Sequence, residues 1–409
     1  MACWAITKVP FVKQAGIDTK YIMLLFLVKI IAGLVIGWVS YNIYGKGNDY
    51  WNTNRDAWKE YQLLWADPQE YFTNLFRSDY SRGYGGIFDS FGSFWNDLRN
   101  NVVVKIVSVF NLFSRGNYYI NSLFFNFFVF IGHVAFYRLF IQVFPRQKAG
   151  VIIGCFLLPS TLYFTAGIQK DGIVFMMLGF LVYCIYQSLQ QHRVTLKRAC
   201  IIMLSCILLF LIRSYVLITI LPSLIAWIAV KRFKWPLLQS FVISYLIMGL
   251  LFFNINALLP SVDPLKTVVD KQAAFSTLPR ASTQVNLDSL YPNFKSFAVN
   301  APQAYNHLLL RPYPWELPAK SLLPLNIELI VYQLLFILFL FFRRKENKGD
   351  PVITFGVFFS FTIFLFIGYI MPNIGSIVRY RSIYLPFLLI PVICGINWKK
   401  IAATIKINK

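Results

Sequence analysis

Two positions in the middle of the chain combine charge with strongly apolar surroundings. The stretch LPSTLYFTAGIQKDGIVFMM, residues 158–177, is apolar almost throughout and carries Lys170 and Asp171 at its middle. The apolar run 199–230 carries Arg213 near its middle. A basic residue at helix-centre depth in a membrane costs about 2.5–3.5 kcal/mol, and much less near the interface. These residues are therefore either helix ends that carry their charge to water or groups that face a phosphate.

A second basic group lies near the end of the chain. In VRYRSIYLP, residues 378–386, Arg379 and Arg381 are separated by one Tyr and lie at the mouth of an aromatic-rich apolar run. Arginine binds phosphate bidentately, and charge-assisted hydrogen bonds contribute about 1.5–3 kcal/mol each. The pattern predicts a phosphate clamp formed by these two arginines.

Acidic residues follow the first apolar run, in GNDYWNTNRDAWKEYQLLW. If this segment is helical, Asp49 and Asp56 lie seven residues apart on one face, and Glu60 follows at the next turn. A carboxylate here could activate an acceptor hydroxyl as a general base, or bind a divalent cation such as Mg²⁺ or Mn²⁺, which the sequence does not require. The alternative, compatible with the first, is an amphipathic helix whose tryptophans rest among lipid headgroups.

The stretch LLLRPYPWELPAK, residues 308–320, combines three prolines with an aromatic and an acidic residue. The prolines make it stiff and extended. Trp315 offers an apolar ring face for a sugar, Glu316 offers a carboxylate for its hydroxyls, and Arg311 is a further candidate for substrate binding. The alternative is a structural plug.

Composition indicates which elements position these residues. The chain has 409 residues, of which 57% are hydrophobic and 14% charged, so it does not resemble a soluble globular protein. Its apolar runs recur at lengths that can cross a hydrocarbon core of roughly 30 Å. We predict an all-α polytopic membrane protein whose residues 1–409 form a single integral membrane domain.

Basic clusters between the apolar runs indicate the topology, because cytoplasmic loops carry an excess of Lys and Arg. We predict about ten transmembrane helices, with both termini in the cytoplasm. Two long extracytoplasmic loops are expected at 45–118, which contains amphipathic helices, and at 254–324. The helices are expected at about 21–44, 119–143, 149–168, 173–189, a pair within 199–230 divided at Arg213, 237–253, 326–342, 351–370 and 383–398.

The distribution of charge supports this topology. Nineteen basic residues fall in the expected cytoplasmic segments, opposed there only by Asp18, Glu346 and Asp350, whereas 45–118 contains eight basic and eight acidic residues. The net charge of +22 therefore points to an anionic membrane face, and no basic soluble domain is present to bind nucleic acid. A further set of charges would gather at the outer face: Asp49, Lys170, Asp171, Arg213, Arg379 and Arg381.

The usual motifs of soluble enzymes are absent from the sequence. It contains no Walker loop, no GxSxG, no HExxH and no DxD motif. His133, His192 and His307 fall in a helix, a cytoplasmic gap and an outer segment, which argues against a His-based metal site.

Several of these features together resemble the GT-C class of membrane glycosyltransferases. They are a first helix that ends in an outside Asp, a long aromatic first loop and the closing RYRSIYLPFLL helix. LPSTLYFTAGIQKDG, LIRSY and LRPYPWE also resemble an uncharacterised group of multi-pass proteins of bacterial polysaccharide assembly. The similarity is spread over most of the chain as short motifs.

The resemblance implies a polyprenyl-linked sugar donor and transfer of the sugar to a saccharide acceptor, at the outer face of the bacterial cytoplasmic membrane. It implies Asp49 as the base, with Asp56 as second choice, and Arg379 and Arg381 as ligands of the lipid phosphate. The acidic pair typical of metal-using members is not clearly present, which leaves cation use open.

The leading hypothesis is a membrane glycosyltransferase or polymerase of cell-surface polysaccharide biosynthesis. Lys170 and Arg213 would join the arginine pair in stabilising the departing phosphate, and Asp171 would contact the substrate. One alternative is an O-antigen-polymerase-like or ligase-like enzyme that works through arginines without a metal or an Asp base. Others are a transporter or flippase of an anionic, lipid-linked solute, and a non-catalytic membrane partner in an assembly complex.

Overall fold

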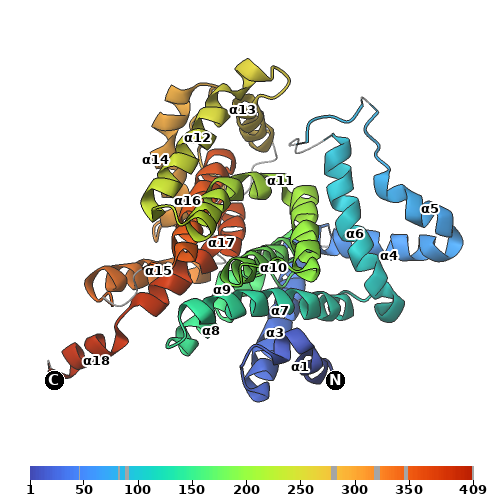
Figure 1. The fold of residues 1–409 in the computed structure, drawn as a ribbon. Coiled ribbons are helices and arrows are strands. Elements are labelled where there is room, and N and C mark those ends of the chain that lie inside the picture. Colours follow the sequence, from blue (N-terminus) through green and yellow to red (C-terminus); the bar gives the residue numbers. More distant parts are fainter. Residues whose placement is uncertain are drawn as a thin grey trace. The chain divides into compact units, whose positions relative to one another are not determined.

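A computed structural model describes most of the chain, and the described part is helical (Figure 1). Two isolated backbone bridges, Gln284 with Asn373 and Arg343 with Ile396, are the only pairings of strand type in that part. The predicted all-α class is confirmed. Glu346 and part of the segment 308–320 lie outside the described residues, which are 1–45, 47–81, 83–87, 92–277, 283–316, 323–344 and 349–407.

Eight helices within the described ranges are long and apolar enough to cross a membrane. They give the chain the multi-pass character that the sequence predicts. The structure differs from the ten predicted spans in two segments, 149–168 and 199–230. The eight are α3 (Thr19–Tyr44), α7 (Tyr118–Val143), α10 (Lys170–Gln190), α11 (Leu196–Phe233), α12 (Leu237–Leu258), α15 (Leu323–Phe341), α16 (Pro351–Ile370) and α17 (Ile374–Gly395).

The segment 149–168 does not form the single helix that was predicted. It contains α8 (Lys148–Phe156) and α9 (Pro159–Phe164), both too short to cross a membrane. Pro159 begins α9, and Leu158 before it has an extended backbone with φ −67° and ψ 116°. A proline disfavours helical geometry in the residue that precedes it, which accounts for the break.

Side chains from two long helices satisfy carbonyl groups beside this break. Lys29 of α3 donates to the Leu162 carbonyl at 3.3 Å and to the Thr165 hydroxyl at 2.5 Å. Nδ1 of His133, in α7, lies 2.6 Å from the Cys155 carbonyl. Both side chains are buried. Backbone polar groups at membrane depth must be satisfied within the protein, so these contacts allow a broken helix there.

The backbone breaks at Arg213, where the sequence predicts the division of 199–230, but the segment counts as one candidate span rather than the predicted two. Arg213, within α11, has φ −147° and ψ 75°, which lie outside the helical region. No Gly or Pro occupies the break, so local sequence alone does not cause it.

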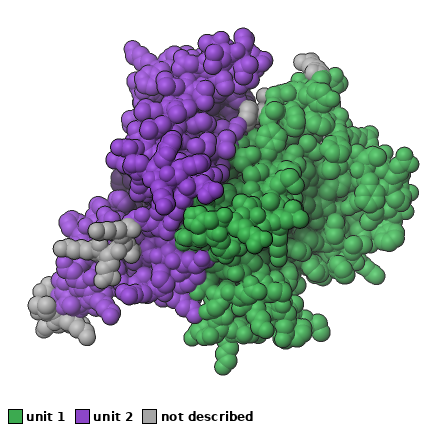
Figure 2. All heavy atoms as spheres, viewed as in Figure 1, with its two compact units in different colours: residues 1–139, 155–217 green, residues 140–154, 218–409 purple. Residues whose placement is uncertain are grey.

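The chain divides into two compact units (Figure 2). Unit 1 comprises residues 1–139 and 155–217, and unit 2 comprises 140–154 and 218–409. The predicted first long loop therefore belongs to unit 1 and the second to unit 2.

The membrane-spanning part of unit 1 packs through aromatic and small residues. Phe26 of α3 lies against Phe130 of α7, with ring centroids 5.2 Å apart. A Cβ added at Gly132 of α7 would lie 2.5 Å from the Met176 Cα of α10, so only glycine permits this approach. The short helices α1 (Ala2–Lys8) and α2 (Pro10–Lys13) precede α3, and α1 packs against it.

The first long segment folds as helices on unit 1. It contains α4 (Asp49–Ala66), α5 (Pro68–Thr73), the 3₁₀ turn η1 (Asn74–Phe76) and α6 (Phe94–Ser114), and α4 packs along α6. Asn54 of α4 donates to the Gly116 carbonyl at 2.9 Å and accepts from Asn121 of α7 at 2.8 Å. Buried amide contacts therefore fix the segment to the start of α7.

In unit 2, the second long segment packs on α16. It contains α13 (Pro264–Ser276) and α14 (Phe294–Leu310), and both contact α16. The Tyr369 hydroxyl donates to the Phe297 carbonyl at 2.6 Å, and Gln272 donates to the Tyr369 carbonyl at 2.8 Å. The last helix, α18 (Trp398–Ile407), follows α17.

Candidate functional site

Asp171 and Arg213 form a buried ion pair inside unit 1. Arg213 Nη2 contacts Asp171 Oδ1, and the two side chains are 6% and 0% exposed. Arg213 Nη1 also donates to the Tyr215 hydroxyl at 2.5 Å. Each charge thus has the other as its counter-ion. The sequence predicted Arg213 as a phosphate ligand and Asp171 as a substrate contact; in the structure their first partners are each other.

Lys170 turns to a different partner, as expected for adjacent residues of one helix. Its Nζ donates to Asn100 Oδ1 of α6 at 2.6 Å. Arg99, which precedes Asn100, donates from Nη2 to the Ser214 hydroxyl at 3.3 Å. The first turns of α6 therefore join the start of α10 to the break in α11.

Arg99 of α6, Lys170 of α10 and Arg213 of α11 lie on helices that these contacts connect, and with Asp171, the partner of Arg213, we call them the unit 1 basic cluster. Three positive charges accompany one negative charge, and the N-terminus of α10 adds partial positive charge. This balance favours an anion such as phosphate. Sequence reasoning missed Arg99, because it is one of eight basic residues in a charge-balanced segment and no spacing distinguishes it.

Asp49 lies at the start of α4, a helix that is hydrogen-bonded to the residue before Lys170 of the unit 1 basic cluster. Asn48 caps the helix by accepting from amides of its first turn, and the Asp49 side chain is exposed. The Thr53 hydroxyl, one turn later, accepts from Gln169 Nε2 at 3.1 Å. Because Gln169 immediately precedes Lys170, α4 begins beside the start of α10.

The tryptophans of α4 do not share one environment. Trp51 stacks on Tyr118 with ring centroids 4.4 Å apart and donates to the Gly37 carbonyl at 3.1 Å. Trp65, by contrast, is 68% exposed. Placement among lipid headgroups therefore suits Trp65, whereas Trp51 fixes α4 to α3 and α7.

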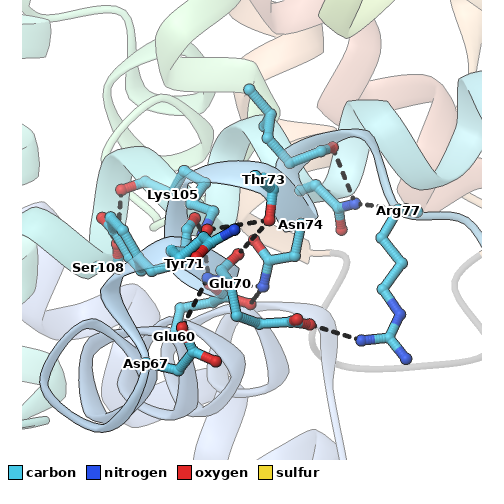
Figure 3. Close-up of polar contacts among 12 residues, drawn as sticks. Glu60, Asp67, Glu70, Tyr71, Thr73, Asn74, Arg77, Lys105 and Ser108 are labelled. Atoms are coloured by element: carbon cyan, nitrogen blue, oxygen red, sulfur yellow. Dashed lines mark hydrogen bonds and ion pairs between the residues drawn. The ribbon is translucent and has the colours of Figure 1, made fainter.

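Asp56 and Glu60 are engaged in ion pairs of their own. Asp56 pairs with Lys59 at 3.6 Å on the exposed side of α4. Glu60 pairs with Lys105 of α6 at 2.6 Å and accepts from Asn74 at 3.0 Å. Figure 3 shows the Glu60 contacts joining α4, η1 and α6. Glu60 therefore stabilises this segment.

In unit 2, Arg381 binds the C-terminal end of α14 rather than presenting itself with Arg379. Its Nη1 donates to the Leu308 carbonyl at 2.6 Å and to the Arg311 carbonyl at 3.1 Å, and the side chain is 3% exposed. A cation is favourable at a helix C-terminus, where carbonyls lack helical partners. In the structure Arg381 therefore caps α14, and these contacts argue against its predicted role as a phosphate ligand.

The start of α17 also argues against the predicted clamp. This helix begins at Ile374, not near 383, so both arginines lie within it. Residues two apart on a helix do not face each other. Arg379 is half-buried and remains the candidate phosphate ligand of unit 2.

The segment after α14 combines an ion pair with an exposed aromatic pair. Arg311 Nη2 lies 3.2 Å from Glu316 Oε1, so two predicted substrate contacts neutralise each other. Trp315 is 79% exposed and stacks on Tyr313 with centroids 4.9 Å apart. Both rings line a cavity of about 310 Å³ together with Asn326 and apolar residues of α15. A sugar ring or an isoprenoid chain suits this lining.

His307, in the last turn of α14, is buried and electrostatically perturbed. Burial lowers its pKa to about 4, the Arg311 guanidinium acts in the same direction, and Asp288 opposes them. Its imidazole is therefore neutral at neutral pH.

The predicted outer-face charges divide between the units. Unit 1 contains Asp49 and brings Lys170, Asp171 and Arg213 together, whereas Arg379 and Arg381 belong to unit 2. Over the part of the chain that the structure describes, no three His, Cys, Asp or Glu side chains are grouped as metal ligands. No protein-family model, no curated protein and no solved structure matches the chain.

Proposed function

We propose that this chain is an integral membrane glycosyltransferase of the bacterial cytoplasmic membrane. It would act at the outer face on a polyprenyl-(pyro)phosphate-linked saccharide, during assembly of cell-surface polysaccharide. The observation that supports this most is the unit 1 basic cluster beside the helix that begins with Asp49. An acid near several cations is the combination that sugar transfer from a phosphate requires.

In the proposed reaction, the acceptor hydroxyl oxygen forms a bond to the anomeric carbon of the donor sugar. The bond between that carbon and the phosphate oxygen breaks, and the polyprenyl (pyro)phosphate leaves with the bonding electron pair. Asp49 takes the hydroxyl proton. Lys170 and Arg99 stabilise the negative charge of the leaving phosphate.

Arg213 has a positioning role, whereas Arg379 and Trp315 have proposed binding roles. Arg213, held by Asp171, fixes the break in α11 against the start of α6 through Ser214 and Arg99. In unit 2, Arg379 is the proposed ligand of a lipid phosphate. The exposed ring of Trp315 is the proposed contact for a sugar face.

The test uses the producing strain with variants of the full chain and a quantitative assay of surface glycan. Asp49→Asn should lower the glycan at least a hundredfold, since a general base contributes about 10²–10⁴ in rate. Lys170→Ala should lower it by about 10²–10³, the effect of removing one group that stabilises developing negative charge. The matched controls Asp18→Asn and Lys20→Ala, both exposed near the start of α3, should retain it. Normal glycan in both site variants would overturn the proposal.

The arginine-based alternative predicts a different pattern. If Arg379→Ala abolishes the glycan while Asp49→Asn retains it, an O-antigen-polymerase-like or ligase-like mechanism replaces the one proposed. Variants should be compared at equal protein abundance in the membrane, because the loss of a folded protein would imitate both outcomes.

A specific observation also favours a second candidate function, transport of an anionic, lipid-linked solute. The short helices α8 and α9 interrupt a membrane-spanning region, and Lys29 and His133 are buried beside the interruption. Broken helices with polar neighbours occur at the binding sites of transporters. Uptake of a labelled lipid-linked saccharide into vesicles, without a new glycosidic bond, would support this candidate.

A further inference from the structure

The C-terminal ends of α15 and α17 are joined by backbone pairing. Arg343 and Ile396 form an antiparallel bridge. The Arg344 amide donates to the Gly395 carbonyl at 2.9 Å, and the Asn397 amide donates to the Phe342 carbonyl at 2.8 Å. Two membrane-spanning helices therefore end together, and their following residues share one place in unit 2.

Four basic residues gather at this junction: Arg343, Arg344, Lys399 and Lys400. Arg344 is half-buried and donates from Nε to the Ile396 carbonyl at 3.0 Å, so it holds the junction together. Arg343, Lys399 and Lys400 are exposed. In the described part of the chain, none of the four forms an ion pair with an acidic residue; the nearby Asp350 pairs with Lys231 at 3.7 Å.

The following helix, α18, has the pattern of a helix that lies in a membrane interface. Trp398 and Ile401 fall on one side of it, and Lys399 and Lys400 fall outside that side. Trp398 Nε1 donates to the Ile393 carbonyl at 3.1 Å, which fixes the indole while leaving it 41% exposed. Figure 1 shows α18 leading away from the end of α17.

We propose that Arg343, Lys399, Lys400 and Trp398 form a binding site for the headgroup of an anionic phospholipid. The exposed cations come from two chain segments that the Arg343–Ile396 bridge brings together. An exposed Trp beside them is typical of the headgroup level of a membrane. The positive charge of the site favours an anionic lipid over a zwitterionic one. A basic residue at an anionic membrane surface contributes about fivefold in affinity. The site is independent of the proposed transferase function.

The test measures lipid binding to the purified full-length protein in detergent, by native mass spectrometry with added phosphatidylglycerol or phosphatidylcholine. The unmodified protein should bind phosphatidylglycerol at least tenfold more tightly. The variant Lys399→Gln/Lys400→Gln should bind phosphatidylglycerol about 25-fold more weakly, because each of the two lost charges contributes about fivefold. The matched control Lys266→Gln/Lys295→Gln, also exposed, should keep it.

A second measurement locates the lipid without relying on these substitutions. The fluorescence of Trp398 is the part of the protein's fluorescence that is missing in Trp398→Phe. Brominated phosphatidylglycerol should quench this part, whereas brominated phosphatidylcholine should not. Equal affinity for the two lipids, equal loss in the control variant, or no quenching at Trp398 would overturn the proposal.

Discussion

Asp171, in the first turn of α10, and Arg213, at the break in α11, form an ion pair with both side chains at least 94% buried. The two residues are 42 positions apart in sequence. Their pairing explains how an apolar run contains a charged residue without exposing the charge to lipid. It also makes the break in α11 dependent on a residue of another helix.

The first prediction follows from this pair. Asp171→Asn or Arg213→Gln alone should destabilise the protein by about 3–5 kcal/mol, because each leaves a buried charge without its counter-ion. Thermal unfolding in detergent measures this loss. The double variant should lose much less than the sum of the two. Additive losses, or single losses below about 1 kcal/mol, would contradict the pairing.

Lys29 supports the broken segment between α8 and α10. Lys29→Met should destabilise the protein by about 1–3 kcal/mol, because the Leu162 carbonyl and the Thr165 hydroxyl lose a buried donor. Lys20→Met, in the first turn of the same helix and exposed, should change stability by less than about 0.5 kcal/mol. Equal effects of the two substitutions in thermal unfolding would show that Lys29 does not stabilise the broken segment.

Substitutions of Arg379 and Arg381 should have different effects on amide hydrogen exchange. Arg381→Gln removes the donor to the Leu308 and Arg311 carbonyls, so amide exchange should accelerate at the end of α14. Arg379→Gln should leave that exchange unchanged and should lower transferase activity. If Arg379→Gln loosens α14 as much as Arg381→Gln, the assignment of the two roles is wrong.

His307 makes unit 2 sensitive to acid. The folded chain keeps His307 neutral down to about pH 4, whereas an unfolded histidine binds a proton below about pH 6.5. The unfolded state therefore binds more protons in this window, and stability falls as pH decreases through it. The loss should reach about 1–3 kcal/mol. His307→Asn should flatten the dependence, measured by thermal unfolding between pH 7 and pH 4.5; an unchanged slope would contradict it.

Sequence patterns predicted the elements well where hydrophobicity and helical period decide. Long apolar runs located the eight candidate spans, and amphipathic helices were expected within 45–118, where α4 is found. The break at Arg213 was predictable because a charge in the middle of a 32-residue apolar run is costly. Pro159 indicates the break before α9, but the continuous hydrophobicity of 149–168 favours a single spanning helix and conceals it.

Partners of charged side chains were not predictable, because they depend on contacts between distant segments. The spacing of Arg379 and Arg381 suggested a clamp, yet Arg381 caps a helix about 70 residues earlier in sequence. Lys29 is a charge within an apolar run and Arg99 is one of many charges in its segment, but neither pattern names a partner, because their contacts lie 133 and 115 residues away. Charged residues in apolar runs indicated where the unit 1 basic cluster lies. The role of each residue depends on its tertiary contacts.

The most direct test of the transferase proposal is the side of the membrane on which its substrate accumulates. In a strain carrying Asp49→Asn, lipid extraction and mass spectrometry should reveal an accumulated polyprenyl-linked saccharide. In intact spheroplasts, periodate added outside should oxidise this saccharide, because the donor has already reached the outer face and only its transfer is blocked. Absence of accumulation, or a saccharide protected from external periodate, would contradict the proposed reaction, and the protected saccharide would indicate transport.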